Sequence, residues 1–303
     1  MNSFWSAFII VLTLANILAC WWLIRWTSKR EPGETAETST TGHVWDGDLT
    51  EYNNPLPRWW LYMFHLSIVF GLAYLVFYPG LGHFSGLLGW TQVTAYEREL
   101  AAAEDRYGPL YAQYGATEIT ALAQNDDAMG TASRLFANNC AVCHGSDARG
   151  APGFPNLTDD AWLYGSDPAA IKTSILNGRS GVMPALGAGL GEDGTRQVAN
   201  YVMSLSGNAP DPESVAAGRD KYMMFCVACH GPEAKGNPML GAPNLTDDAW
   251  LYGSSLAAII ETINSGRNGI MPAHKDLLGE DRSHLLAAYV YKLSGGATAA
   301  GTE

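Results

Sequence analysis

Two short motifs of the form Cys-x-x-Cys-His carry the clearest chemistry in this chain of 303 residues. Two thiols three positions apart lie on one helical face, where each can form a thioether to one vinyl group of a haem, and the adjacent histidine can reach the iron. The spacing therefore predicts two covalently attached c-type haems. The residues that would hold them are Cys140, Cys143 and His144 in the first motif and Cys226, Cys229 and His230 in the second.

A Cys-x-x-Cys pair can also serve a thioredoxin-like redox site or a zinc site. The first needs a strand and a helix around the pair, a context that this sequence does not supply. A zinc site needs four ligands, and the repeated methionine would have no role in it. Neither site accounts for a histidine directly after both pairs, so haem attachment is the interpretation that fits.

The other axial ligand of each iron should recur at matching positions. Met183 and Met271 follow His144 and His230 by 39 and 41 residues, and each is followed by Pro-Ala. Histidine and thioether ligands favour a closed, six-coordinate iron of fairly high potential, which moves electrons and binds no substrate. Each methionine could serve the haem of its own repeat or that of the other, and spacing does not decide between them. His83, His274 and His284 have no repeat counterpart and are expected on the surface, although His274 is close enough to Met271 to be a rival ligand.

These motifs belong to a duplicated unit. The string PNLTDDAWLYGS occurs at 155–166 and again at 243–254, an offset of 88 residues, and the two cysteine motifs are offset by 86. We predict a first repeat at 130–207 and a second repeat at 216–295, each opening and closing with a helix around glycine- and proline-rich loops. Residues 91–129 indicate a helical connector.

The first 90 residues predict a membrane anchor. Apolar runs at about 4–26 and 59–79 are each long enough to cross a bilayer as a helix. All lysines and arginines of this part flank the loop between the two runs, which predicts a cytoplasmic loop and, in a bacterial inner membrane, periplasmic repeats. These residues are Arg25, Lys29, Arg30 and Arg58.

Two residues inside the apolar runs could have a special role. Cys20 follows Leu18 and Ala19 as a lipid-attachment cysteine would, but the sequence after it stays apolar, which favours a small buried side chain. His65 could ligate a buried haem or hydrogen-bond to a neighbouring helix, and a single histidine favours the second role.

The chain is acidic, with a formal net charge of -12 and an isoelectric point near 4.9. This balance argues against nucleic acid as the main partner. After Thr91 lie 24 of the 30 acidic residues and 14 of the 18 basic ones. The excess of negative charge predicts that a basic donor protein is steered electrostatically to this part of the chain.

Each repeat resembles a class I cytochrome c domain in its Cys-x-x-Cys-His motif, its PNL segment and its methionine loop. In that family a proline carbonyl accepts a hydrogen bond from the ligand histidine, and Pro155 and Pro243 match that proline. The resemblance implies two tandem helical haem domains, and these with the two N-terminal transmembrane helices indicated by the apolar runs predict a mainly α fold. Six further residues could pack on haem or bind its propionates, or could equally be ordinary core or surface residues: Trp162, Tyr164, Arg179, Trp250, Tyr252 and Arg267.

Residues 43–60, HVWDGDLTEYNNPLPRWW, resemble the N-terminal signature of the CcoP/FixP family, the dihaem subunit III of cbb3-type cytochrome c oxidases. The resemblance covers essentially the whole chain. It implies an electron-transfer subunit of the bacterial inner membrane that itself holds no oxygen-reducing site. The implied partners are periplasmic donor cytochromes, a monohaem cytochrome subunit and the haem-copper subunit that reduces oxygen and moves protons.

Other functions fit parts of the sequence. A free-standing, membrane-anchored dihaem carrier would have the same haem chemistry, but the signature and the two aromatic-rich spans argue against it. A dihaem peroxidase would need one haem with an exchangeable site, which the paired methionines disfavour. A structural or assembly subunit with incidental haems would leave oxidase turnover normal when His144 or His230 is replaced.

Overall fold

The computed structural model describes residues 2–29, 40–52, 56–207 and 212–296. Arg30, which contributed to the predicted orientation, lies outside the described residues. The chain packs as two units, Met1–Asp105 and Arg106–Glu303, and the boundary falls inside helix α3 (Gln92–Gly115). Helices dominate both units, which confirms the mainly α class.

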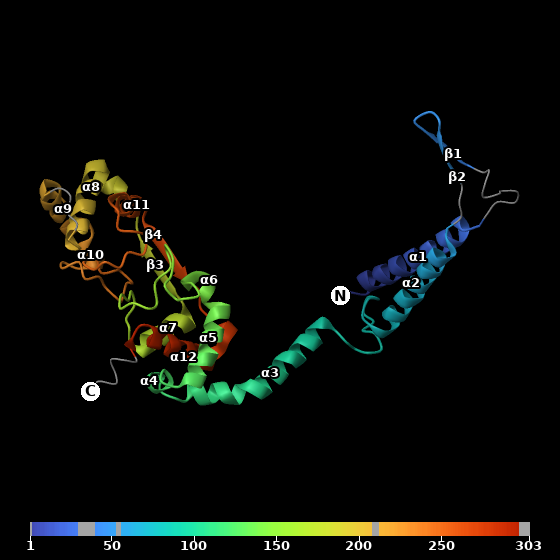
Figure 1. Ribbon diagram of the computed structural model, residues 1–303, viewed down its shortest axis with the longest axis horizontal. Coiled ribbons are helices and arrows are strands. Elements are labelled where there is room, and N and C mark those ends of the chain that lie inside the picture. Colours follow the sequence, from blue (N-terminus) through green and yellow to red (C-terminus); the bar gives the residue numbers. More distant parts are fainter. Residues whose placement is uncertain (1, 30–39, 53–55, 208–211, 297–303) are drawn as a thin grey trace. The chain divides into compact units, whose positions relative to one another are not determined.

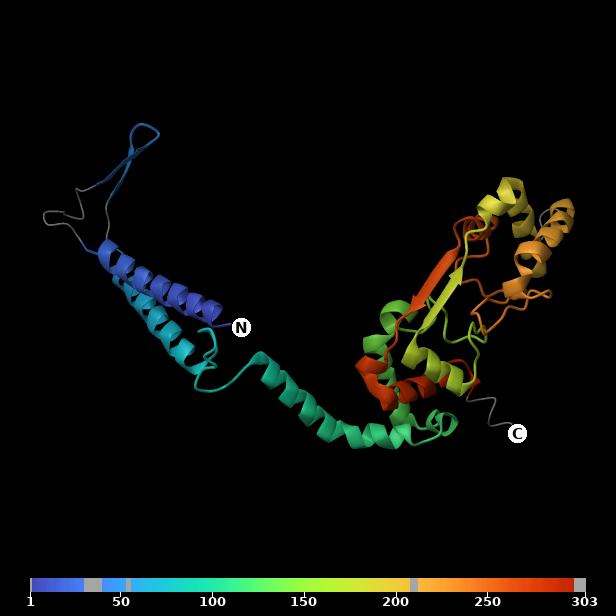
Figure 2. The same cartoon turned by 180° about the vertical axis from the view of Figure 1, so that it is seen from behind.

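The first unit is a pair of apolar helices, α1 (Ser3–Thr27) and α2 (Arg58–Phe77), side by side in Figures 1 and 2. Their mean hydropathies are 2.3 and 1.8, and both are long enough to span a bilayer. Ser6 near the start of α1 is buried, and its hydroxyl accepts a hydrogen bond from the backbone N–H of His83 in the loop after α2. This bond ties the start of α1 to the end of α2.

A short hairpin lies between the two helices in sequence. Strand β1 (Thr40–Trp45) pairs antiparallel with β2 (Leu49–Tyr52), with an irregularity between Thr40 and Val44. The turn contains Asp46 and Gly47, both with positive φ, as a tight hairpin turn requires. The hairpin occupies the segment from which the family signature was identified.

The second unit begins with the end of α3 and α4 (Ile119–Leu122) and then runs twice through one series of elements. The first repeat has α5 (Asp126–Asn139), α6 (Ala141–His144), α7 (Pro168–Asn177), β3 (Arg179–Met183) and α8 (Gly187–Leu205). The second has α9 (Pro212–Phe225), α10 (Val227–His230), α11 (Leu256–Ser265), β4 (Arg267–Met271) and α12 (Lys275–Leu293). The duplication in sequence is therefore a duplication of secondary structure.

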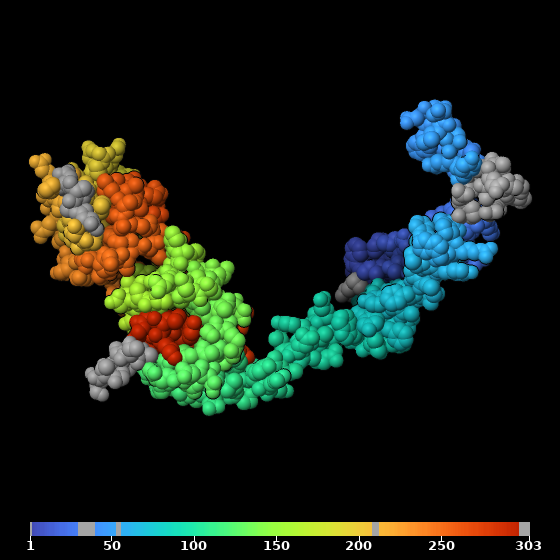
Figure 3. Space-filling model, in the orientation of Figure 1, coloured from blue at the N-terminus to red at the C-terminus, as the bar shows by residue number. Residues whose placement is uncertain are grey.

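The closing helix of each repeat packs on the other repeat. Helix α12 lies against α5 and α7 of the first repeat and against α4 before it, whereas α8 lies against α9 and α11 of the second repeat. In Figure 3 the red C-terminal segment sits among green segments of the first repeat. The sequence repeats at 130–207 and 216–295 are thus not the same as the packed bodies.

Two hydrophobic cores result from this exchange. The first core joins α5, α6 and α7 to α12, and includes Phe136, Ile171 and the fully buried Leu285 and Leu286. The second core joins α8 to the second repeat and includes Val198, Tyr222 and Ile259. A salt bridge of 3.1 Å between Lys172 of α7 and Glu280 of α12 lies at the exposed rim of the first core, where such pairs add little stability.

Strands β3 and β4 connect the two cores. They pair antiparallel in the register Arg179 with Met271, Gly181 with Gly269 and Met183 with Arg267. The register is symmetric about the glycine pair, so the ribbon relates the two repeats by an approximate twofold axis. We did not predict these strands, because each has only five residues and its partner is about 90 residues away in sequence.

Candidate functional site

Each Cys-x-x-Cys-His motif forms one helical turn at the end of a longer helix. Cys140 ends α5 and precedes α6, and its carbonyl accepts the backbone N–H of His144 at 3.0 Å. The second motif repeats this arrangement, with His230 bonded to Cys226 at 3.0 Å. The turn brings both thiols and the imidazole of each motif into one compact group, as covalent attachment of a haem requires.

The two histidines are held in matching orientations. The Nδ1–H of His144 donates to the carbonyl of Pro155 at 3.0 Å, and that of His230 donates to the carbonyl of Pro243 at 3.1 Å. With the proton on Nδ1, the Nε2 lone pair of each ring is free for a metal. The contact that the class I resemblance implied for Pro155 and Pro243 is therefore present in both repeats.

Burial shifts the pKa values of Cys140, Cys226 and His230. It lowers the pKa of His230, although the hydrogen bond to the Pro243 carbonyl partly opposes this effect. Burial, with a smaller contribution from Cys143, raises the pKa of the Cys140 thiol to about 11, and burial with Cys229 does the same for Cys226. At neutral pH the imidazole of His230 is therefore favoured in the neutral form that binds metals.

The methionines lie with the opposite repeat. Met271 of the second repeat packs against the first core, and so do Cys140 and Trp162 of the first repeat. Met183 of the first repeat packs against the second core, which contains Cys226 and Trp250. Each core therefore combines the attachment motif of one repeat with the methionine of the other.

Backbone contacts fix this crossing on both sides of the ribbon. The N–H of Leu186 donates to the carbonyl of Ile263 at 2.9 Å, and the equivalent N–H of His274 donates to the carbonyl of Ile175 at 3.0 Å. Gly178 has φ +69°, and a Cβ there would overlap the carbonyl of Met271; Gly266 stands in the same relation to Met183. Sequence analysis missed both glycines, although each precedes the arginine of its repeat.

The close approach of Gly178 to the Met271 carbonyl predicts a specific effect of Gly178→Ala. Alanine at positive φ costs about 1–2 kcal/mol, and the added Cβ must also displace the Met271 carbonyl. If Met271 ligates the haem of the first motif, we expect a fraction of chains to lose this ligation, measured as loss of the low-spin Met-iron absorption band. Gly191→Ala is the matched control, because Gly191 has φ +67° and open space around it. Equal spectra for the two variants would contradict the role of the close approach.

The candidate arginines are held in equivalent positions. The guanidinium of Arg179 lies over the ring of Tyr164 at 4.5 Å, and its Nε donates to Ser174 at 2.8 Å. Arg267 lies over Tyr252 at 4.4 Å, and its Nε donates to Thr262. By the strand register each arginine stands opposite a methionine. A contact of these side chains with haem stays a prediction.

The remaining histidines have other surroundings. We expected His83, His274 and His284 on the surface, and for His284 this is wrong. Its side chain is buried, and Nε2–H donates to the carbonyl of Thr117 at 2.8 Å, because α12 is drawn into the first core. His65 uses Nδ1–H within its own helix, donating to the Leu61 carbonyl at 2.7 Å.

Comparison with known proteins agrees with this architecture. The sequence model of the family described as the N-terminal domain of cytochrome oxidase-cbb3, FixP, matches residues 37–85. That of cytochrome c oxidase, cbb3-type, subunit III matches twice, at 127–202 and 213–290. The FixP match contains the β1–β2 hairpin and α2, and the other two contain the attachment motifs.

Individual relatives are similar over nearly their full length. The chain is 43% identical over 300 residues to the cbb3-type cytochrome c oxidase subunit CcoP of Rubrivivax gelatinosus, covering 99% of this chain and 98% of the relative. It is 41% identical to the FixP subunit of Bradyrhizobium sp. strain ORS 278, covering 88% and 98%. It is 37% identical to CcoP of Cereibacter sphaeroides, covering 89% and 98%. The chain therefore belongs to the CcoP/FixP family of membrane-anchored cytochrome c subunits of cbb3-type oxidases, with haem c as its cofactor.

Proposed function

We propose that the chain carries two haems c and is the subunit through which electrons enter a cbb3-type oxidase. A haem bound in such a site exchanges one electron with a neighbouring redox centre. The single observation that carries the proposal is that both repeats hold a Cys-x-x-Cys-His turn with its histidine oriented by a proline carbonyl. Two equally built sites support two haems.

We propose crossed axial ligation. Cys140 and Cys143 would attach the first haem, with His144 and Met271 as its iron ligands. For the second haem the residues are Cys226, Cys229, His230 and Met183. The packing of each methionine in the core of the opposite motif supports this assignment, as do the backbone bonds at Leu186 and His274. Thioether ligands would close both iron sites to water.

The proposed partners are soluble periplasmic cytochromes on the donor side, and the monohaem and haem-copper subunits on the acceptor side. The names of the relatives, which are subunits of cbb3-type oxidases, support an assembly of this kind. The basic residues around the loop between α1 and α2 support an inner-membrane orientation with that loop in the cytoplasm and both haem cores in the periplasm.

Electrostatic steering of the donor is testable by ionic strength. If the acidic excess after Thr91 attracts a basic donor, the association rate should fall about tenfold or more between low and physiological salt, because screening shortens the range of attraction to about 8 Å. Stopped-flow reduction of the intact oxidase by a basic cytochrome c would measure it. A rate independent of salt would contradict steering.

Isolation from the native membrane tests the function itself. The chain, tagged at its C-terminus and extracted in mild detergent, should bring with it b-type haem, further c-type haem and cytochrome-c-driven oxygen uptake. A species with two c-type haems per chain and no oxygen uptake, from an extract in which other respiratory complexes stay intact, would instead identify a free-standing carrier.

A further inference from the structure

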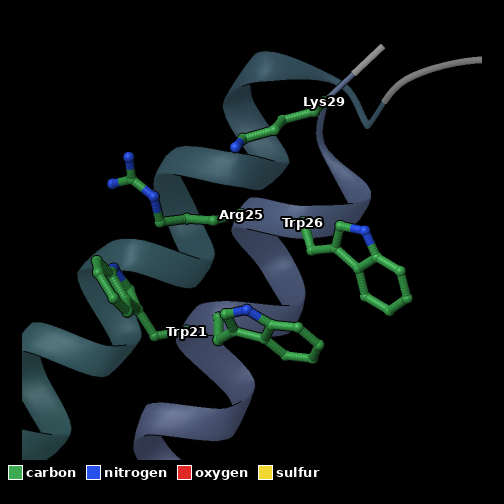
Figure 4. A pocket seen from close by; sticks show the side chains of 5 residues that line it. Trp21, Arg25, Trp26 and Lys29 are labelled. Carbon is green, nitrogen blue, oxygen red and sulfur yellow. The ribbon is translucent and has the colours of Figure 1, made fainter. Parts of the chain in front are cut away.

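The end of α1 near the α1–α2 loop carries a pocket of about 180 Å³. Its lining comes entirely from the last turns of α1 and the residues directly after it. Figure 4 shows Arg25 and Lys29 extending to one side of the helix, where the ring of Trp21 also lies, and the ring of Trp26 extending to the other side. The lining residues are Trp21, Trp22, Arg25, Trp26 and Lys29.

The aromatic walls are ordered by contacts along the helix. The guanidinium of Arg25 lies over the ring of Trp21, 5.1 Å from its centroid. The rings of Trp22 and Trp26 stack at 5.0 Å with an interplanar angle of 28°. Both pairs are four residues apart, so they form two neighbouring rows on one helix surface. A groove with indole walls and a cationic end results.

The charges of Arg25 and Lys29 are not neutralised by a carboxylate of the described residues. In the described parts of the chain, no Asp or Glu lies within ion-pair distance of Arg25 or Lys29. The helix below them is apolar and exposed along this surface, for example at Leu18. Positive charge at one end and apolar surface along the rest match a molecule with an anionic head and a hydrocarbon tail.

We propose that this pocket binds one anionic phospholipid. Arg25 and Lys29 bind the phosphate oxygens of the headgroup, Trp22 and Trp26 flank the glycerol region, and an acyl chain follows α1 past Leu18. An anionic lipid is favoured over a zwitterionic one, because a choline or ethanolamine group would bring a third positive charge close to Arg25 and Lys29. The site depends on membrane insertion of α1 and not on the haem assignments.

The test measures lipid bound to the purified intact oxidase. The complex is reconstituted in nanodiscs of phosphatidylcholine with about 20% phosphatidylglycerol. It is then released from the nanodiscs, and the lipids that stay bound are identified by native mass spectrometry. We expect one retained phosphatidylglycerol per chain, enriched over phosphatidylcholine. The Arg25→Gln/Lys29→Gln double variant should reduce this enrichment at least fivefold. Trp26→Ala should reduce the retention of both lipids.

Arg58→Gln is the matched control, because Arg58 begins α2, flanks the same loop and does not line the pocket. It should leave the enrichment unchanged. Equal loss in this variant would show diffuse attraction by the surface charge and would overturn a specific site. Equal retention of both lipids by the unmodified complex would also overturn the proposal. The same holds if the double variant keeps its lipid and instead dissociates from the other subunits. Oxygen uptake by the same preparations reports the proposed function separately.

Discussion

Met271→Ala is expected to remove the sixth ligand from the haem attached at Cys140 and Cys143, although Met271 belongs to the other repeat. The reason is that Met271 packs in the first core, while Met183 packs in the second. Loss of the thioether should convert that haem to a high-spin or water-ligated form and lower its reduction potential by on the order of 0.1 V or more. Absorption and electron paramagnetic resonance spectra with a redox titration would measure it.

A single-haem background assigns the effect to one site. Cys226→Ser/Cys229→Ser leaves only the first attachment motif, and there Met271→Ala should abolish the low-spin spectrum while Met183→Ala preserves it. Cys140→Ser/Cys143→Ser gives the reciprocal background with the opposite expectation. If Met183→Ala instead removes the sixth ligand of the first haem, ligation follows the repeats in sequence and the crossing is refuted.

Leu285→Gln is expected to destabilise the second unit by about 3 kcal/mol or more. Leu285 is fully buried in the first core, so the change removes apolar contacts and buries an amide without a prepared partner. Chemical denaturation of the intact chain, followed through haem absorption, would give the loss as a shift of the transition midpoint. If the substitution detaches α12 from the first core, Met271 should leave that core as well.

The control is the equivalent position of α8. An offset of 88 residues aligns Gln197 with Leu285, and Gln197 is only partly buried in the second core. Gln197→Leu should therefore change stability by less than about 1 kcal/mol. A loss in Gln197→Leu as large as that in Leu285→Gln would mean that the two closing helices face equivalent surroundings.

The comparison of these helices explains why the crossing is specific. If α8 covered the first core, Gln197, which is only partly buried where it stands, would replace the fully buried Leu285. Burying its amide there costs roughly 1–3 kcal/mol when it lacks hydrogen bonds. Asn200 is already buried in α8, so it does not distinguish the two arrangements. Helix α12 offers an apolar side chain at the position of Gln197, and this difference favours the observed pairing of closing helices with cores.

Local spacing was enough to predict the chemistry. The motifs at Cys140 and Cys226, the two apolar spans and the repeated Met-Pro-Ala each depend on residues that are near in sequence. A thioether pair needs one helical turn, and a membrane span needs only length and apolar composition. The hydrogen bonds of His144 and His230 also join residues that are near in sequence, and the resemblance to class I domains was enough to predict them.

Only the tertiary structure decided which methionine lies with which motif. The pairing of β3 with β4 and the exchange of α8 and α12 join residues about 90 positions apart, and two similar repeats offer two nearly equivalent pairings to any sequence pattern. The choice depends on how Leu285 and Gln197 fit two different cores, and on Gly178 and Gly266 accepting the opposite strand's backbone. The sequence determined what each site contains, and packing between the repeats determined which half supplies each part, because burial depends on neighbours that the chain brings together only when folded.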